Sequence, residues 1–246
     1  MTPARIAVAP PAYFPGLVYV ALIQHVDHFI LADTFPFRQR SFQDRSKVRS
    51  PQGWHWISIP VVGHREGAPL PEVEIRTAGR WREKHWRSFL YNYRTTPYFE
   101  FFEDSFRPFF ERAWGRLAPC LCRSVQLTAD LFGVRTRITR ASALSGTPCT
   151  YADIVTAVSP DALVVLDASE PVDLPGNVSV YECTYEQEPY RQNFEGFVPG
   201  MSALDLMFNY GPEARRVLTD GRTVASHSRE APGAHPGSQP TGSSQA

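Results

Sequence analysis

The sequence lacks the features that define several large classes of protein. Only four of its 246 residues are cysteine, which is too few for a scaffold held by disulfides, so we expect reduced and mostly buried thiols. Lys and Arg together number 25, as do Asp and Glu, so the formal net charge is zero. There is therefore no overall basic surplus to attract a nucleic-acid polymer or an anionic membrane.

Long apolar runs are also missing. The longest strongly apolar run covers residues 14–23, whereas a helix that crosses a membrane needs about 20 apolar residues. Pro10, Pro11 and Pro15 interrupt the stretch near the N-terminus that would have to serve as a secretion signal. We therefore expect a cytoplasmic protein without membrane insertion.

No complete catalytic or metal-binding signature stands in the chain. The nucleophile elbow, the phosphate-binding loop, the zinc-protease motif and the dinucleotide fingerprint are all absent. Cys120 and Cys122 form a C-x-C pair with no second close pair to complete four ligands. His25 and His28 have a metal-binding spacing, but they straddle the end of a predicted helix and no third ligand is evident. The sequence therefore predicts no metal site.

Proline and aromatic residues are abundant. The 22 prolines are about 9% of the chain, against a usual ~5%, and they accompany 16 Phe, 10 Tyr and 5 Trp. A hydrophobic content of 43% is enough to build a real core. From residue 219 the composition turns to Ser, Gly and Pro with few large apolar residues. We expect one domain over residues 1–218 and a disordered tail over 219–246.

The order of periodic segments predicts an α/β fold. The pattern predicts a strand over residues 6–9, a helix over 17–25 and a second strand over 29–32. Together they would form a βαβ unit with two parallel strands. The middle of the chain is helical, with an amphipathic helix over 81–93 and further helices from 98 and over 117–132. Later apolar runs over 162–166 and 178–181 add strands. We expect a central, mostly parallel sheet.

The ends of the first two predicted strands form a candidate ligand site. In open α/β sheets, ligands bind at the carboxyl ends of the strands, where Asp33 and the proline-rich loop 10–16 lie. The helix that begins at Leu17 points its N-terminus there and can hold an anion. The alternative is that the prolines only terminate a strand and shape a turn.

A basic stretch over residues 38–49 forms a second candidate site. Gln43 and Arg45 lie in it, and Arg45 can make a bidentate contact to a carboxylate or a phosphate. The alternative is a solvated loop in which Arg and Asp pair with each other on the surface. In a chain of balanced charge, this local cluster favours a small anionic ligand over a polymer.

Two further groups of polar residues lie among large apolar ones. His85 is a possible proton shuttle with Asn92 and Tyr93 two turns on, or else a histidine packed between aromatic rings. Asp205 and Asn209 share a helix face and follow Gln192, so they are either buried and satisfied or part of a site.

The order and spacing of these motifs resemble the WbqC-like family of bacterial proteins over about residues 4–218. The motifs that carry the resemblance are Pro10–Pro15, Ser41–Ser46, Pro51–Val61, Trp81–His85, Asn92–Tyr93, Pro97–Phe99, Tyr190–Gln192, Ser202, Asp205 and Phe208–Ala214. The resemblance implies transfer of an acyl or aminoacyl group, glycine being one option, to an amino group in surface-polysaccharide (O-antigen) or secondary-metabolite biosynthesis. It also implies an amino sugar or other amine as acceptor, with ATP or an activated acyl donor as the co-reactant.

The resemblance also implies roles for particular residues. His85 or Asp33 would be the base that deprotonates the acceptor amine. The substrate-binding residues would be Gln43, Arg45, Asn92, Tyr93, Gln192, Asp205 and Asn209.

Six positions depart from the family pattern: Pro10, Val18, Thr34, Pro36, Asp44 and Ser46. These departures imply either a different substrate or a reduced activity. They leave open a non-catalytic protein that binds small molecules or organises a biosynthetic complex.

Overall fold

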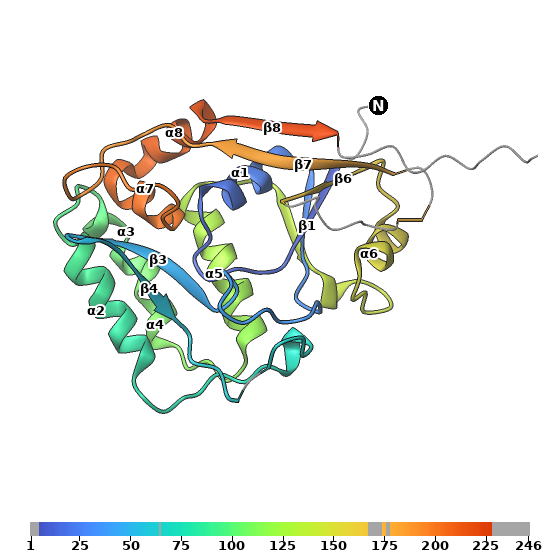
Figure 1. Cartoon of the computed structure of the whole chain (residues 1–246), viewed down its shortest axis with the longest axis horizontal. Helices are drawn as coiled ribbons and strands as arrows, with labels where there is room; N and C mark the ends of the chain where they lie inside the picture. The colour runs from blue at the N-terminus through green and yellow to red at the C-terminus, as the bar shows by residue number, and fades with distance from the viewer. Residues whose placement is uncertain (1–4, 64, 167–173, 176–177, 228–246) are drawn as a thin grey trace, which may run out of the picture.

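A six-stranded sheet of order β5-β2-β1-β6-β7-β8 runs through the molecule (Figure 1). The computed structural model describes residues 5–63, 65–166, 174–175 and 178–227. Every neighbouring pair of strands is parallel except β7 and β8. This confirms the α/β class, the mostly parallel sheet and the parallel pair that opens the chain. The strands are β1 (Arg5–Ala9), β2 (His28–Leu31), β5 (Arg137–Arg140), β6 (Ala162–Val165), β7 (Ser179–Glu186) and β8 (Arg222–His227).

Helices cover both faces of the sheet, and the side chains of β1 alternate between them. Ala7 and Ala9 pack in a core cluster with α1 (Leu17–His25) and α5 (Leu117–Leu131). Ile6 and Val8 pack in a second cluster with α6 (Tyr151–Val158). Burial on both faces explains why β1 and β6 are apolar along almost their whole length rather than alternating in polarity. Among the described residues, no helix is both long and apolar enough to span a bilayer.

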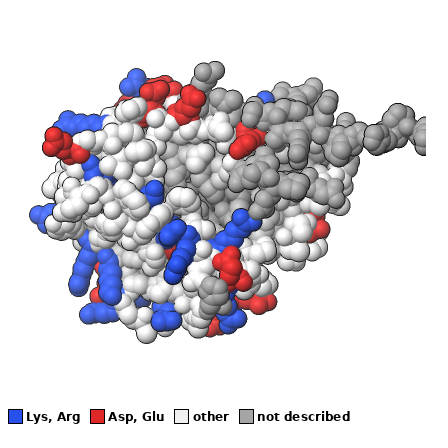
Figure 2. Space-filling model, in the orientation of Figure 1, with Lys and Arg blue, Asp and Glu red and all other residues white. Residues whose placement is uncertain are grey.

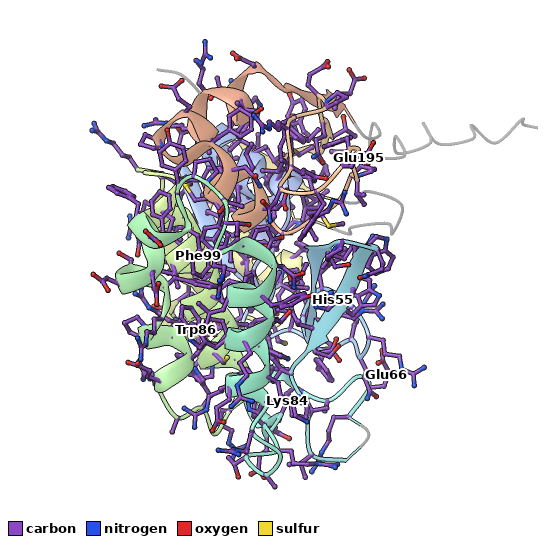
Figure 3. All side chains as sticks on the ribbon, turned by 90° about the vertical axis from the view of Figure 1, so that its left-hand side faces the viewer. His55, Glu66, Lys84, Trp86, Phe99 and Glu195 are labelled. Atoms are coloured by element: carbon purple, nitrogen blue, oxygen red, sulfur yellow. The ribbon has the colours of Figure 1, made fainter. Side chains whose placement is uncertain are left out.

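A third and larger cluster is rich in aromatic rings and lies beside the sheet, where Figure 1 shows the hairpin and α2 to α4. Figure 3 shows Trp86 and Phe99 in this helical layer and His55 on the hairpin that faces it. The His55 ring lies 2.8 Å from the Ser88 hydroxyl of α2. The elements of this layer are β3 (Arg45–Ser50), β4 (Gly53–Ser58), α2 (Trp81–Tyr93), α3 (Phe99–Phe106), α4 (Pro108–Glu111), α7 (Ala203–Tyr210) and α8 (Ala214–Asp220). Short 3-10 turns occur at Leu70–Glu72, Ala141–Ala143 and Gly211–Glu213.

Three elements differ from what the sequence alone predicts. The basic stretch contains β3, which pairs antiparallel with β4, rather than forming a solvated loop. Helix α6 is not among the predicted helices, although it begins with a capping box between Thr150 and Asp153. The predicted tail starts at residue 219, but in the structure β8 pairs through its backbone with β7. Residues 228–246 of the predicted tail lie outside the described residues.

Phe14 anchors the loop between β1 and α1 to the aromatic core. Its backbone has φ 42°, a left-handed conformation that costs free energy for a bulky residue. The buried ring contacts Phe106 and Phe109, with centroids 5.3 and 4.9 Å away. Its N–H donates to the Ser124 hydroxyl at 2.6 Å, and its carbonyl accepts from the Ser46 hydroxyl at 2.9 Å. These contacts hold the loop in a conformation that it would not adopt alone.

We expect Phe14→Ala to lower the free energy of unfolding by about 3–5 kcal/mol, because it leaves a cavity in a packed aromatic cluster. Phe101→Ala is the matched control, since the Phe101 side chain is 71% exposed, and it should change stability by less than about 0.5 kcal/mol. Urea denaturation measures both values. Equal stability of the two variants would contradict the anchoring role of Phe14.

Candidate functional site

The chain changes direction in the sheet at β1. Strand β2 follows β1 in sequence and lies on one side of it, whereas β6 comes much later and lies on the other side. In open α/β sheets, such a switch point places a crevice at the carboxyl ends of the two strands. Two adjoining cavities, of about 420 and 470 Å³, lie at these ends, and both are lined by Pro10, Arg38, Gln43 and Leu166.

The first cavity is mainly apolar. Its walls include Tyr19 and Val18 in the first turn of α1, together with Phe42 and Met201. Helix α1 begins after Gly16 without a side-chain cap, so the positive end of its dipole contributes to the wall. This cavity therefore suits an apolar group that carries a small negative charge at one end.

The second cavity is more polar and lies on the α6 side. It is lined by Cys149, Thr150 and Tyr151 at the start of α6. Gln43 lines both cavities, although only 6% of its surface is exposed. Its Oε1 accepts from the Arg38 backbone N–H at 2.7 Å, and no partner for Nε2 is found among the described residues. Gln43 is thus the predicted binding residue that the structure places at the cleft.

His85 and Asp33 lie elsewhere. The Nδ1 of His85 is 2.9 Å from the Tyr13 hydroxyl, and its ring meets Trp81 edge-on in the aromatic core. Burial lowers the pKa of His85 to about 4, against a smaller raising contribution from a hydrogen bond to the backbone of Ser58. Asp33 accepts from the backbone N–H and the hydroxyl of Ser142, at 2.9 and 2.7 Å. Neither side chain lines either cavity, and their catalytic roles stay predictions.

Three of the predicted binding residues meet in a buried network away from the cleft. The Asp205 carboxylate accepts from the Tyr190 hydroxyl at 2.6 Å and from Gln192 Nε2 at 2.9 Å. Burial raises the pKa of Asp205, and the hydrogen bonds from Tyr190, Tyr93 and Gln192 oppose that rise. Arg49, only 2% exposed, donates to Gln192 Oε1 at 3.0 Å, and its backbone N–H donates to the Tyr93 hydroxyl at the same distance.

Arg49 also binds the chain that crosses over the hairpin. Its guanidinium donates to the Glu195 carbonyl of that segment and to the Gly53 carbonyl of the hairpin itself, each at 2.7 Å. Figure 3 shows Glu195 in the loop above the hairpin. Sequence reasoning missed Arg49 and Tyr190 as members of this network. The period-two spacing of Arg45, Lys47 and Arg49 was the available signal for a strand, and a strand can bury an arginine against main-chain carbonyls.

Asn92 and Asn209 make local hydrogen bonds. Asn209 Nδ2 donates to the Asp205 carbonyl one turn earlier, at 2.7 Å, and Asn92 Nδ2 donates to the Ser88 carbonyl at 2.7 Å. The Asn92 carbonyl accepts from Asn193 at 2.7 Å, while its side-chain oxygen is buried without a partner. These contacts join α2 to the loop that carries Gln192.

The residues that depart from the family pattern divide into two groups. Pro10, Val18 and Pro36 line the cavities. The other three bind the backbone: the Thr34 hydroxyl donates to the Pro148 carbonyl, the Ser46 hydroxyl donates to Phe14, and the Asp44 carboxylate accepts from the Arg40 N–H at 3.1 Å. The cleft walls therefore carry the changes that would alter a ligand.

Free cysteines and acidic side chains do not gather into a metal centre in the described part of the chain. No group of three or more His, Cys, Asp or Glu side chains is placed to hold an ion there. Three of the four cysteines are buried and all four are free, as expected, and Cys149 is the exposed exception.

We expect Arg49→Lys to lower the free energy of unfolding by about 3 kcal/mol, because one ammonium cannot satisfy the carbonyls and the amide that the guanidinium binds. Arg40→Lys, at an exposed position, should have little effect. Chemical denaturation measures the difference, and a loss below about 0.5 kcal/mol for Arg49→Lys would contradict the network.

We expect His85 to titrate near pH 4 rather than near its usual 6.5, which NMR of the imidazole measures directly. The folded-state pKa lies below the unfolded one, so the neutral ring stabilises the fold above pH 6.5. That contribution, about 3 kcal/mol, is lost as the pH falls through 4. His85→Gln should lack this pH dependence, and identical pH–stability curves for the two proteins would refute the assignment.

Comparisons with known proteins identify a family and a relative of this chain. No solved structure matches the chain. An uncharacterised protein of Mycobacterium tuberculosis (strain ATCC 25618 / H37Rv), Rv1507c, is 28% identical over 222 residues, which cover 85% of this chain and 95% of that protein. The model of the WbqC-like protein family matches residues 10–217. The range runs from the first residue of the cleft loop to the last helix, so the chain belongs to the WbqC-like protein family.

Proposed function

We propose that this protein is a cytoplasmic transferase that joins an acyl or aminoacyl group to the amino group of a small acceptor such as an amino sugar. The observation that carries the proposal is the pair of cavities at the switch point, the second more polar than the first, which meet at Gln43. A transfer reaction needs two reactants side by side, and holding them together removes much of the entropic barrier. Surface-polysaccharide or secondary-metabolite biosynthesis would use such an amide.

The cleft supplies binding groups suited to this chemistry. Gln43 Nε2 can donate a hydrogen bond to the carbonyl oxygen of an acyl donor, where negative charge develops during transfer. ATP or an already activated donor would supply the leaving group. His85 and Asp33 enter the proposal as predicted bases only, because neither side chain lines the cavities. Turnover should therefore be measured for His85→Gln and Asp33→Asn, and unchanged rates would remove both residues from the mechanism.

A non-catalytic binding protein is the second candidate. The cleft walls carry Pro10, Val18 and Pro36, and their side chains can neither donate nor accept a proton. This favours binding without reaction. The two candidates differ in one result: the enzyme releases an amide product from a bound donor and acceptor, whereas the binding protein releases both unchanged.

Occlusion of the first cavity tests the site itself. Val18→Trp should fill that cavity, and Val62→Trp is its control, because both valines are 38% exposed and Val62 does not line either cavity. Nucleotides, aminoacyl donors and amino sugars are screened by thermal shift. At about 100 times its Kd a ligand stabilises the fold by about 2.7 kcal/mol.

We expect the shift in the unmodified protein and in Val62→Trp, and its loss in Val18→Trp. An equal shift in all three proteins would place the ligand elsewhere. The absence of any shift in the unmodified protein would remove the small-molecule function.

A further inference from the structure

The outer face of the β3–β4 hairpin carries alternating cations and aromatic rings. Antiparallel pairing sets Lys47 opposite Trp56 and Arg49 opposite Trp54. Because side chains alternate along a strand, Arg45, Lys47, Trp54 and Trp56 project from the same face, while Val48 and Ile57 point into the core. In Figure 2, Lys and Arg side chains stand on a mostly uncharged surface in the region where Figure 1 draws this hairpin.

The rings hold two cations in place. The guanidinium carbon of Arg45 lies 4.1 Å from the centroid of Trp56, and the Lys47 ammonium lies 4.5 Å from Trp54 and 5.4 Å from Trp56. The two charges thus flank one ring, and stacking restricts their side-chain rotamers. We call Arg45, Lys47, Trp54 and Trp56 the cation–aromatic cradle.

The hydrogen-bonding capacity of the cradle is unused. Neither the Arg45 nor the Lys47 side chain has a hydrogen bond or ion pair within the described residues, and the Nε of Arg45 is buried without a partner. A buried donor without an acceptor costs free energy that a ligand would recover. Asp44 is the nearby acid, and burial raises the pKa of its carboxyl overall, although the charge of Arg45 acts to lower that pKa. The carboxylate accepts a hydrogen bond from the Arg40 N–H and none from Arg45.

The cradle adjoins the first cavity along two edges. Phe42 lines that cavity and meets Trp56 edge-on, with centroids 5.8 Å apart. Gly200 also lines the cavity, and a Cβ at that position would lie 3.9 Å from the Lys47 ammonium. A ligand of modest size can therefore contact the cradle and the cavity together.

We propose that the cradle binds the phosphate groups of a small phosphorylated ligand, such as a nucleoside diphosphate, whose organic part enters the first cavity. The cations have free donors and anchored positions, which suits a compact anion. Each ring already has a cation over it, which disfavours stacking of a neutral sugar there. A cradle of two cations on a chain of zero net charge is too small for a polyanion. The placement of the organic part rests on the proposed function, whereas phosphate binding does not.

Calorimetric titration with inorganic pyrophosphate tests the cradle alone. Arg45→Gln and Lys47→Gln should each weaken binding about tenfold or more, as expected for loss of a charge-assisted contact. Arg112→Gln is the matched control, because Arg112 also stacks on a tryptophan, with its guanidinium carbon 4.5 Å from Trp114, but lies outside the hairpin that forms the cradle. It should bind pyrophosphate as the unmodified protein does. Circular dichroism establishes that each variant is folded.

Titration with UDP, and with uridine as its counterpart without phosphates, separates the two proposals. Val18→Trp should leave pyrophosphate binding unchanged and weaken UDP binding. If the protein binds pyrophosphate but no ligand binds in the cleft, the result would support the cradle and refute the proposed function.

Three results would overturn the cradle: no saturable binding of pyrophosphate, binding by Arg45→Gln and Lys47→Gln as tight as by the unmodified protein, or tighter binding of an oligonucleotide than of pyrophosphate. Each of them leaves the Val18→Trp result on the acyl or amine ligands intact, so the two failures are distinguishable.

Discussion

The fold depends on how Phe14 is held between the sheet and the aromatic core. Its ring packs among phenylalanines of the helical layer, and this placement forces a left-handed backbone at a bulky residue. Two serine hydroxyls, from β3 and α5, satisfy its N–H and carbonyl. Because Phe14 comes just before α1, the same contacts determine where that helix begins and therefore where the wall of the cleft lies.

The buried Arg49 network fixes the position of the hairpin, as the contacts of Phe14 fix the loop between β1 and α1. By binding Gln192 and main-chain carbonyls from two segments, Arg49 ties β3 to the chain that leads into α7. With β3 held in this way, the face that bears Arg45 and Lys47 is directed outward beside the cleft. Arg45, Lys47 and Arg49 lie on the same face of this strand, and the segment that carries Gln192 and Glu195 buries Arg49.

The local sequence pattern predicts much of the architecture, and the elements that it does not predict have a common physical cause. The helix over 81–93 and the helix that carries Asp205 and Asn209 depend on short-range periodicity, and both are confirmed. Strands β3 and β8 are polar, and they exist because a partner strand pairs with their backbones. Nothing in their own composition reports that partner. In the same way, the local sequence around His85 and Asp205 is consistent with either a reactive or a buried group. Segments far away in the chain determine whether these side chains are buried.

The sequence by itself determined the α/β class, the parallel pair that opens the chain and the family, since these rest on short-range periodicity and on the order of motifs. Only the tertiary structure decided which polar residues share a site. It placed Gln43 at the cleft with Arg38, joined Tyr93, Gln192 and Asp205 to Arg49 in the interior, and packed His85 against Tyr13 and Trp81. The physical reason is that a polar group acts through its neighbours, and these neighbours come from strands and loops that only folding brings together.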